Sequence, residues 1–422
     1  MASRRSQPYD YHFSKKLPDP KFECLKPLKF TYLHEMKKAW SFICIILALS
    51  CSKDHHDLYN FDPTTLEEKP VFLSDIADDI TLIPLDNSVP LGLIYNDIFF
   101  CNNSIYLSTK DNGVLAFSRS GKFLRNIGTK GRGPGEYAFC SEIGIDEDKE
   151  ILHVRDNRTI RVFSITGRFI RSFSLEEFGR IEEMEFFDSK TFATFYPGEN
   201  NSEFAWLVLD SLGKMIKRGE RRLPVFESNY GVGAGIYRFM NQICYWDNFI
   251  DTVYSVSPDL TEKPSFIIST GNHRSPRGRI KSFEDLVNKL VIKNIFETKK
   301  FLVIRYSYQK PTIALIEKES HRYFLAYLAG DDSGLLEWNL TGGITDDLSG
   351  GPAFLPHSSF EEDGIEYMFG LIDSWQIKSH VESPGFSNTK STLPDKKEEL
   401  KKLAASLKET DNSVIVLVRL KK

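Results

Sequence analysis

The chain has 422 residues, a formal net charge of −4 and 41% hydrophobic residues. Both signs of charge are mixed along the chain, which excludes the large basic face that nucleic-acid binding requires, so we expect no nucleic-acid partner. Phenylalanine (32 residues) and tyrosine (17 residues) are abundant, and aromatic residues favour β-strands. The length fits two or three ordinary domains or one large all-β domain.

The segment that begins at Met36 has the pattern of a bacterial signal peptide. Two lysines precede the apolar run 39–49, and Ser50-Cys51 follows it. The run is too short for a membrane span, which needs roughly twenty residues. "ALSC" resembles a loose lipobox, so we expect residues 36–50 to be a lipoprotein signal peptide and Cys51 to be lipidated. Residues 1–35 have no place in such a precursor, and we interpret them as a mis-assigned N-terminal extension.

Residues 51–70 are expected to form a lipidated, flexible tether. Its beginning, SKDHHD (52–57), is polar and acidic, and it resembles the signal that sends some Gram-negative lipoproteins to the cell surface. We therefore predict a lipid anchor in the outer membrane. His55 and His56 lie on this tether without a scaffold that would fix a metal geometry, so no metal site is predicted there.

Three cysteines follow the tether, namely Cys101, Cys140 and Cys244. An odd number cannot all pair within one chain, and none has the CxxC spacing of redox or zinc sites. We expect free, buried thiols.

An internal repeat of 46 residues begins in the first third of the chain. The stretches 105–127 and 151–173 share the order strand, turn, strand, turn ending in glycine, strand. Gly121, Gly167 and Gly213 follow one another at this spacing, and a further step reaches Asp259. Several short strands per period of this length are typical of a β-propeller. At the three glycines we expect turns with a positive φ, which glycine adopts without steric cost.

The glycine-rich stretch GTKGRGPGEY (128–137) lies between two of these repeats. A phosphate loop would require G-x-x-x-x-G-K-[ST] followed by a helix, whereas YAFCSEIGID (137–146) has no helical pattern. We therefore predict a corner between blades and no nucleotide site at Lys130 or Arg132. The structural residues of this corner are Gly128, Gly131, Gly133, Pro134, Gly135, Glu136 and Tyr137.

Together these motifs resemble the six-bladed β-propeller lipoproteins of Gram-negative outer membranes, relatives of the NHL-repeat propellers. GTKGRGPGEY is similar to their G-x-x-G-x-G-P-G-E-[YF] signature, and DDLSGGPAFLP (346–356) resembles a late motif of the family. LKETDNSVIVLVRLKK (407–422) resembles their closing segment, with Ser413 in place of a proline. The resemblance covers residues 71–422 and implies a six-bladed propeller of four-stranded antiparallel blades.

The two ends of this region are expected to meet. The last strand, 414–420, and the first strand, 80–85, are predicted to share one blade, which removes free sheet edges. Leu400, Leu403 and Leu407 have helical spacing, which predicts a short helix near the C-terminus.

No catalytic motif of the G-x-S-x-G or H-E-x-x-H kind is present, so enzyme activity stays open and a binding role is favoured. The acidic runs 146–148 and 361–363 are interpreted as solvated turn residues. Aromatic side chains can stack on a sugar or a peptide, with packing between blades as the alternative for each. The aromatic candidates are Tyr245, Trp246, Trp338 and Trp375.

We therefore predict a binding module for a glycan, a peptide or an outer-membrane protein, without a cofactor. The alternative is a lactonase-like hydrolase or lyase with a metal such as calcium in the central channel. Calcium takes oxygen ligands, and Asp156, Asn157 and Asp247 are the candidate ligands under this alternative.

Overall fold

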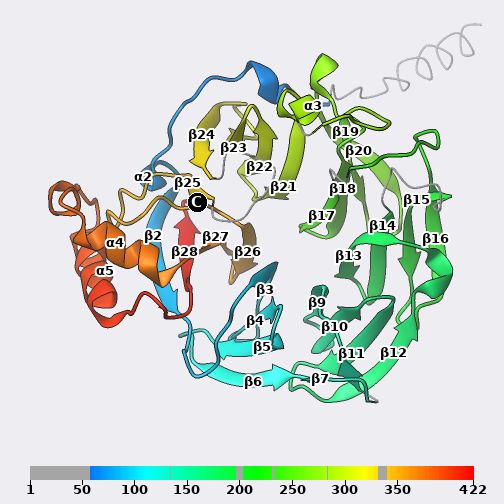
Figure 1. Ribbon diagram of the computed structural model, residues 1–422, viewed down its shortest axis with the longest axis horizontal. Helices are drawn as coiled ribbons and strands as arrows, with labels where there is room; N and C mark the ends of the chain where they lie inside the picture. The colour runs from blue at the N-terminus through cyan, green and yellow to red at the C-terminus, as the bar shows by residue number, and fades with distance from the viewer. Residues whose placement is uncertain (1–57, 134, 196–202, 231–232, 283, 331–339) are drawn as a thin grey trace, which may run out of the picture. The chain divides into compact units, whose positions relative to one another are not determined.

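The computed structural model describes residues 58–133, 135–195, 203–230, 233–282, 284–330 and 340–422. Residues 58–422 form one compact unit, in which six mainly antiparallel sheets surround a central axis (Figure 1). The prediction of an all-β, six-bladed propeller is confirmed. The predicted N-terminal extension, signal peptide and lipidated Cys51 lie outside the described residues.

Blades 1–3 each have four strands, numbered from the axis outward. Blade 1 consists of β3 (Ile94–Cys101), β4 (Ser104–Thr109), β5 (Gly113–Ser118) and β6 (Phe123–Ile127). Blade 2 consists of β9 (Glu142–Asp146), β10 (Ile151–Asp156), β11 (Thr159–Ser164) and β12 (Phe169–Ser174). Blade 3 consists of β13 (Ile181–Phe187), β14 (Lys190–Phe195), β15 (Phe204–Leu209) and β16 (Met215–Glu220).

Blades 4 and 5 have five strands, one more than the expected four. Blade 4 consists of β17 (Ala234–Phe239), β18 (Gln242–Asp247), β19 (Thr252–Val256), β20 (Glu262–Ile268) and β1 (Asn60–Phe61). Blade 5 consists of β21 (Val291–Glu297), β22 (Phe301–Tyr308), β23 (Lys310–Glu317), β24 (Tyr323–Ala329) and β25 (Thr341–Gly342).

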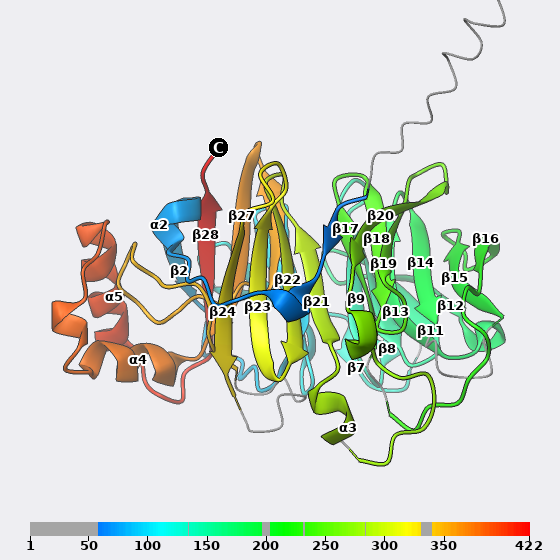
Figure 2. The same cartoon turned by 90° about the horizontal axis from the view of Figure 1, so that it is seen from above.

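Blade 6 joins the two ends of the chain, as predicted. It consists of β26 (Ser358–Glu362), β27 (Ile365–Ile372), β28 (Val414–Leu420) and β2 (Ala77–Pro84). Antiparallel β28 and β2 are in register with Val418 opposite Ile80. Because the first strand completes the last blade, the ring closes through a full ladder of hydrogen bonds. The side view in Figure 2 shows β28 and β2 next to each other.

The turns between the third and fourth strands explain the 46-residue repeat. Gly121, Gly167 and Gly213 have φ values of 83°, 95° and 85°, which confirms the expected positive φ. Each glycine also lies against the preceding blade. A Cβ on Gly121 would lie 2.0 Å from the Pro84 carbonyl oxygen, and one on Gly213 would lie 2.4 Å from the Phe173 ring. Close approach and backbone conformation therefore both require glycine.

A second repeated contact joins the corresponding turns of blades 2, 3 and 4 to the preceding blade. Arg125 Nη1 donates to the Ile165 carbonyl at 3.4 Å, and Arg171 Nε donates to the Ser211 carbonyl at 2.9 Å. Lys217 Nζ makes the equivalent hydrogen bond to the Leu260 carbonyl at 2.5 Å. A cation on each outer strand thus holds the turn of the next blade, which explains why a basic residue recurs with the glycine.

The corner at 128–137 is also confirmed. β7 (Thr129–Lys130) and β8 (Glu136–Tyr137) form a small parallel pair between blades 1 and 2. The buried Tyr137 hydroxyl donates to the Ile127 carbonyl at 2.8 Å and accepts from the Val114 N–H at 3.0 Å. Glu136 accepts from the Gly133 N–H at 2.8 Å. Pro134 lies outside the described residues.

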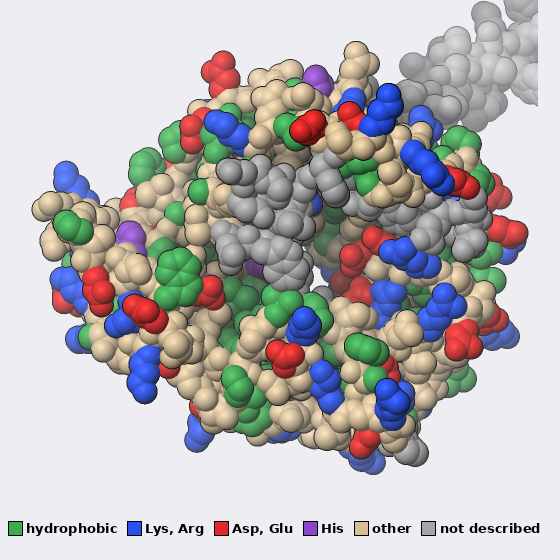
Figure 3. Space-filling view, in the orientation of Figure 1, with side chains coloured by type: hydrophobic (Ala, Val, Ile, Leu, Met, Phe, Trp, Pro, Cys, Tyr) green, Lys and Arg blue, Asp and Glu red, His purple; other side chains and the backbone are tan. Residues whose placement is uncertain are grey.

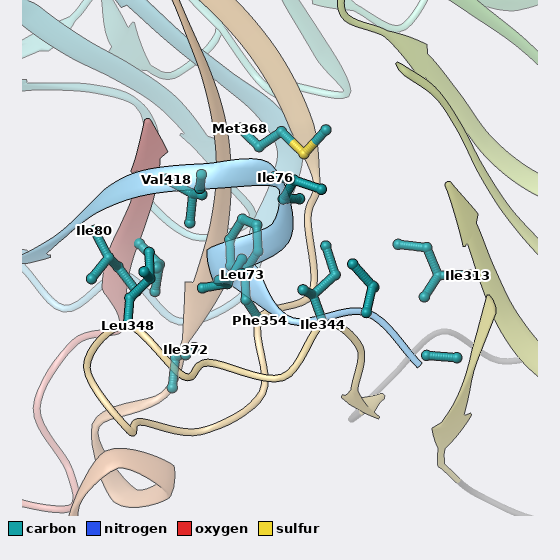
Figure 4. Packing of buried hydrophobic residues seen from close by; sticks show 14 of the residues in the cluster. Leu73, Ile76, Ile80, Ile313, Ile344, Leu348, Phe354, Met368, Ile372 and Val418 are labelled. Carbon is teal, nitrogen blue, oxygen red and sulfur yellow. The ribbon is translucent and has the colours of Figure 1, made fainter. Parts of the chain in front are cut away.

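Two short helices cover the outside of blade 6. The predicted C-terminal helix is α5 (Pro394–Ser406), and α4 (Ser374–Glu382) precedes it without having been predicted. Leu400 and Ala404 of α5 belong to the same hydrophobic cluster as Ile80 of β2. Figure 4 shows Leu73 and Ile76, from α2 (Leu73–Ile76), among the packed side chains of this cluster.

Residues 58–70, assigned by the sequence to the tether, make specific contacts with the propeller. β1 pairs in parallel with β20, and the Lys69 N–H donates to the Leu325 carbonyl at 3.0 Å. The compact unit therefore begins at Leu58 rather than at the expected residue 71.

Cys101, Cys140 and Cys244 are buried, as expected, and form no disulfide within the described part of the chain. Burial raises the pKa of Cys101 and of Cys244 to about 12, and a thiol that stays protonated is a poor nucleophile. Within the described ranges no helix is long and apolar enough to cross a membrane.

Candidate functional site

The inner strands of all six blades line a central cavity of about 610 Å³. In a propeller the first strand of each blade runs beside the axis. The walls of the cavity are therefore formed by these inner strands and by the turns that follow them. Figure 3 shows a hollow near the centre of the ring with acidic side chains at its edge. Its acidic lining residues are Asp146, Glu147, Asp148, Glu183, Glu185, Asp188, Glu297, Glu361 and Glu366.

Basic residues are fewer on the described lining, which carries Arg238, Lys293 and Lys299. The carboxylates of blades 5 and 6 already have partners. Glu297 lies 2.6 Å from Lys318 Nζ and accepts from the Tyr237 hydroxyl at 2.7 Å. Glu361 lies 2.7 Å from Lys299 Nζ. Asp188 of blade 3 is paired as well, with Lys190. Six of the nine acidic lining residues nevertheless belong to blades 2 and 3, so the negative potential of the cavity arises mainly on that side.

Two carboxyl groups on that side have altered acidity. Burial raises the pKa of Glu185, an inner-strand residue of β13, although Arg238 and the Phe186 N–H oppose this. Partial loss of water at the turn after β9 also raises the pKa of Glu147, and Arg238 again opposes the shift. One guanidinium thus acts on carboxylates from two neighbouring blades.

Apolar residues from several blades also line the cavity, and one group of them lies where blades 6 and 1 meet. The rings of Phe100 and Phe360 are stacked with centroids 4.2 Å apart, and Arg119 covers both rings from 5.0 and 5.5 Å. Met240, on the turn after β17, is 69% exposed at the cavity edge. The cavity lining therefore combines carboxylates, most of them from blades 2 and 3, with aromatic and aliphatic side chains from several blades.

The aromatic candidates do not form one site. Tyr245 and Trp246 of β18 are 5% and 4% exposed. The Tyr245 hydroxyl contacts Arg222 and Glu262, and its ring lies among Phe192 and Tyr254. These two side chains are therefore packed between blades, which is the alternative role, and Trp246 also borders the central cavity.

Trp375 lies elsewhere, on α4 outside blade 6, and is 48% exposed. It borders a separate hollow of about 330 Å³. Trp338 lies outside the described residues.

The candidate calcium ligands are also dispersed. Asp156 pairs with Arg161 at 2.9 Å and accepts from the Phe139 N–H. Asn157 is an exposed turn residue with a φ of 57°. Asp247 accepts from the Phe249 and Ile250 N–H groups, and burial raises its pKa to about 6. Among the described residues, no group of three or more His, Cys, Asp or Glu is placed to hold a metal.

The acidic lining was missed at the sequence level. Residues 146–148 and 361–363 lie in or beside turns, and Glu147, Asp148 and Glu361 are exposed, as expected of solvated turn residues. The sequence did not indicate that these three residues also line the cavity. The available signal was the strand IEEMEFF (181–187), which carries acidic residues between buried apolar ones. Such a pattern indicates a strand with one face toward a polar space.

The family model described as "Domain of unknown function (DUF4934)" matches residues 58–419. Among solved structures, a Bacteroides fragilis protein that is inferred to be exported has a TM-score of 0.62 and 20% identity. The match covers 86% of this chain and 99% of that chain. At this identity the likeness shows the fold alone.

A member of the DUF4221 family from Bacteroides vulgatus has a TM-score of 0.47 and 12% identity, over 84% of this chain and 99% of that chain. A streptogramin B lyase has a TM-score of 0.41 and 12% identity, over 68% of this chain and 94% of that chain. Scores this low support no argument about the present chain. No curated protein matches it.

Proposed function

The chain belongs to the family defined by the domain of unknown function DUF4934, and on that premise we propose that it is an exported, lipid-anchored binding protein of the cell surface. Its ligand is a peptide with a basic side chain, which enters the central cavity. The six-bladed fold and the similarity to a Bacteroides fragilis protein inferred to be exported support the general role. The excess of carboxylates on the cavity wall carries the choice of ligand.

A cationic side chain fits this wall for an electrostatic reason. A cleft lined by one sign of charge with low-dielectric walls concentrates counter-ions of the other sign. Glu147 and Glu185 lie on neighbouring blades and share the field of one guanidinium, Arg238. A ligand ammonium or guanidinium adds a second positive charge beside these carboxylates and partly offsets the negative charge of the wall.

A peptide is favoured over a glycan because of what the cavity exposes. Neutral sugars are held mainly by open aromatic faces and hydrogen bonds, but Tyr245 and Trp246 are buried. The exposed Met240 at the cavity edge suits the aliphatic stem of a lysine or arginine. Both requirements of a basic side chain, charge at its end and carbon along its stem, are met.

The binding test is calorimetric titration of the chain with a short lysine-rich peptide and with an acetylated version of that peptide. We expect the charged peptide to bind more tightly. Glu147→Gln with Glu185→Gln is expected to weaken binding by about tenfold, which corresponds to about 1.4 kcal/mol. The control pair Glu176→Gln and Glu177→Gln removes the same charge from η2 (Glu176–Phe178), which does not line the cavity, and should change little.

The pH dependence follows from the same carboxyl groups. Their pKa values are raised above the usual 4.5, so they become protonated at a higher pH than ordinary glutamates when the solution is acidified. Binding of the charged peptide should therefore weaken as the pH falls toward 4.5, before most surface carboxylates are neutralised. Equal affinity for both peptides, or no pH dependence, would contradict the proposal.

The anchor is tested separately by fractionation of cells that express Cys51→Ala. The charged, apolar and small-residue segments before Cys51 motivate this variant. A single acyl chain holds a protein to a membrane only marginally, and two or more hold it stably. We expect the variant to leave the outer membrane, and retention as firm as that of the wild type would contradict lipidation at this cysteine.

A further inference from the structure

The outer edges of blades 4–6 are covered by other parts of the chain. β1 adds to β20 as a fifth strand of blade 4, and β25 adds to β24 as a fifth strand of blade 5. In blade 6 the outer strand β2 is covered by α5, whose Lys396 lies 3.3 Å from Asp79. Strand edges that would otherwise offer unpaired backbone groups are thus occupied in this half of the ring.

The outer edges of blades 1–3 are not covered in this way. β6, β12 and β16 end their sheets, and none of the described strands pairs with their outer sides. These strands follow the lower and right-hand margin of the ring in Figure 1. The backbone N–H and C=O groups on an open edge can accept an added strand, as β20 and β24 do within this same molecule.

Basic residues recur on these open edges. Lys122, Arg168 and Lys214 lie 46 residues apart, immediately before the three strands, and all are exposed. Their side chains make no hydrogen bond or ion pair with the described residues, in contrast to Arg125, Arg171 and Lys217, which hold the turns. Lys122 lies in the field of Asp86 and Lys214 in that of Asp210, and both carboxylates already accept backbone N–H groups.

Acidic residues are scarce at the same edges. β6 and β12 contain none, and β16 contains only Glu220. The outer strand of blade 6, by contrast, contains Asp78 and Asp79. The open edges therefore carry positive charge in a chain whose net charge is −4.

Apolar side chains accompany these basic residues at the same spacing. Leu124 and Ile170 are each 40% exposed, and Ile216 is 46% exposed. Phe169 and Met215 are each 37% exposed. Exposed basic residues are one means by which proteins prevent an open strand edge from pairing with other sheets. Exposed apolar side chains beside them do not contribute to that protection. Their combination is typical of a contact surface.

We propose that the edges of β6, β12 and β16 bind an extended acidic segment of another polypeptide. The segment pairs with an edge as a fifth strand, in the way that β1 and β25 pair in blades 4 and 5. The backbone of the segment forms hydrogen bonds with the unpaired backbone groups of the edge. Its carboxylates pair with Lys122, Arg168 or Lys214. Its apolar side chains pack on Leu124, Ile170 or Ile216.

Charge complementarity decides between occupants. A second copy would bring its own basic edge against this one, and like charges opposite each other destabilise strand pairing. An acidic strand removes this repulsion, because its carboxylates lie within reach of the basic residues on the edge. This interaction is separate from the central cavity and does not depend on the function proposed there.

The test uses the complete chain and two short synthetic peptides of equal charge. One alternates Glu and Val, and the other alternates Glu and Pro, which removes every second backbone donor. We expect the Glu–Val peptide to bind and to protect the amides of β6, β12 and β16 from hydrogen exchange. The Glu–Pro peptide should bind at least about tenfold more weakly.

Matched variants identify the surface. The triple variant Lys122→Gln, Arg168→Gln and Lys214→Gln should lower the affinity for the Glu–Val peptide by about tenfold or more. The control triple variant Lys390→Gln, Lys402→Gln and Lys408→Gln removes three exposed lysines around α5 and should leave the affinity unchanged.

Three results would overturn the proposal. One is equal binding of both peptides without protection of edge amides, which would indicate a general polyanion surface, and dextran sulfate would then compete equally well. Another is self-association of the chain in sedimentation experiments that the first triple variant abolishes, which would indicate a second copy as the occupant. The last is the absence of binding by the Glu–Val peptide.

Discussion

In blades 1–3 the turn between the third and fourth strands recurs at a fixed spacing, whereas in blades 4–6 it changes from blade to blade. In blade 4 the corresponding residue is Leu260, which lies 47 rather than 46 residues after Gly213 and takes the left-handed conformation with a φ of 65°. In blade 5 the turn begins at Glu317, whose carboxylate accepts a hydrogen bond from the Arg322 side chain. Blade 6 has no such turn, because its third and fourth strands come from opposite ends of the chain.

The difference follows from what each half must contact. In blades 1–3 the turn approaches the preceding outer strand through a glycine without a side chain, and in blades 2 and 3 a basic residue of that strand also holds a carbonyl of the turn. The same turn conformation can therefore be repeated in these three blades. Blades 4–6 must also close the ring and cover their outer edges with β1, β25 and α5. The additional residues that make those contacts change the spacing between the turns of neighbouring blades.

The largest expected effect is on the first glycine of the regular half. Gly121→Ala places a Cβ 2.0 Å from the Pro84 carbonyl oxygen at a φ of 83°. Gly364→Ala, in blade 6, has a similar φ of 75° but nothing within 4 Å of its Cβ. Left-handed strain alone costs about 1–2 kcal/mol, so the control should lose about that much, and Gly121→Ala should lose more than about 3 kcal/mol.

Urea unfolding of both variants measures the two costs. A similar loss for the two would mean that the turn of blade 1 can move away from Pro84, and that backbone conformation alone explains the repeated glycine.

The interface of blades 2 and 3 should respond to acid. His153 of β10 is buried against the Phe186 ring, with centroids 4.2 Å apart, and its Nδ1 has no hydrogen-bond partner among the described atoms. Burial lowers its pKa from 6.5 to about 3. Between these values the unfolded chain binds more protons than the folded one, so the free energy of unfolding falls as the pH falls from 6.5 toward 3.

His153→Phe should remove this part of the pH dependence, since the ring stack remains and no proton is bound. Urea unfolding at several pH values between 6.5 and 4.5 compares the two proteins before most carboxylates titrate. Parallel curves would show that His153 makes no contribution to acid sensitivity.

The smallest effect concerns the hydrogen bond that holds one repeated turn. Arg171→Met keeps much of the side-chain volume but removes the donor to the Ser211 carbonyl, at 2.9 Å. We expect a loss of about 0.5–1.5 kcal/mol, as is typical of one hydrogen bond. Arg168→Met, on the same strand edge and without a described hydrogen bond from its side chain, should be close to neutral. Thermal unfolding measures both, and equal losses would contradict the holding role of Arg171.

Local sequence patterns were sufficient for the regular half of the ring. The spacing of Gly121, Gly167 and Gly213 predicted both the blades and the positive φ, because a tight turn imposes the same backbone conformation wherever it occurs. The resemblance of the two ends to the propeller family predicted the closing strands 80–85 and 414–420, and Leu400, Leu403 and Leu407 predicted α5. The short helix α4 was missed, since only Ser374 and Ile377 of its side chains are buried and its apolar pattern is weak.

The central site and the open edges were decided by the tertiary structure. Glu147 and Glu185 are ordinary acidic residues in the sequence, and they face one cavity only because two inner strands from different repeats converge on the axis. Tyr245 and Trp246 look like binding residues by type, but neighbouring blades bury their rings. Residue type and spacing determine the local backbone conformation of this protein. Which side chains share a cavity, a core or a bare edge depends on contacts between residues far apart in the chain, and the closed ring of blades creates those contacts.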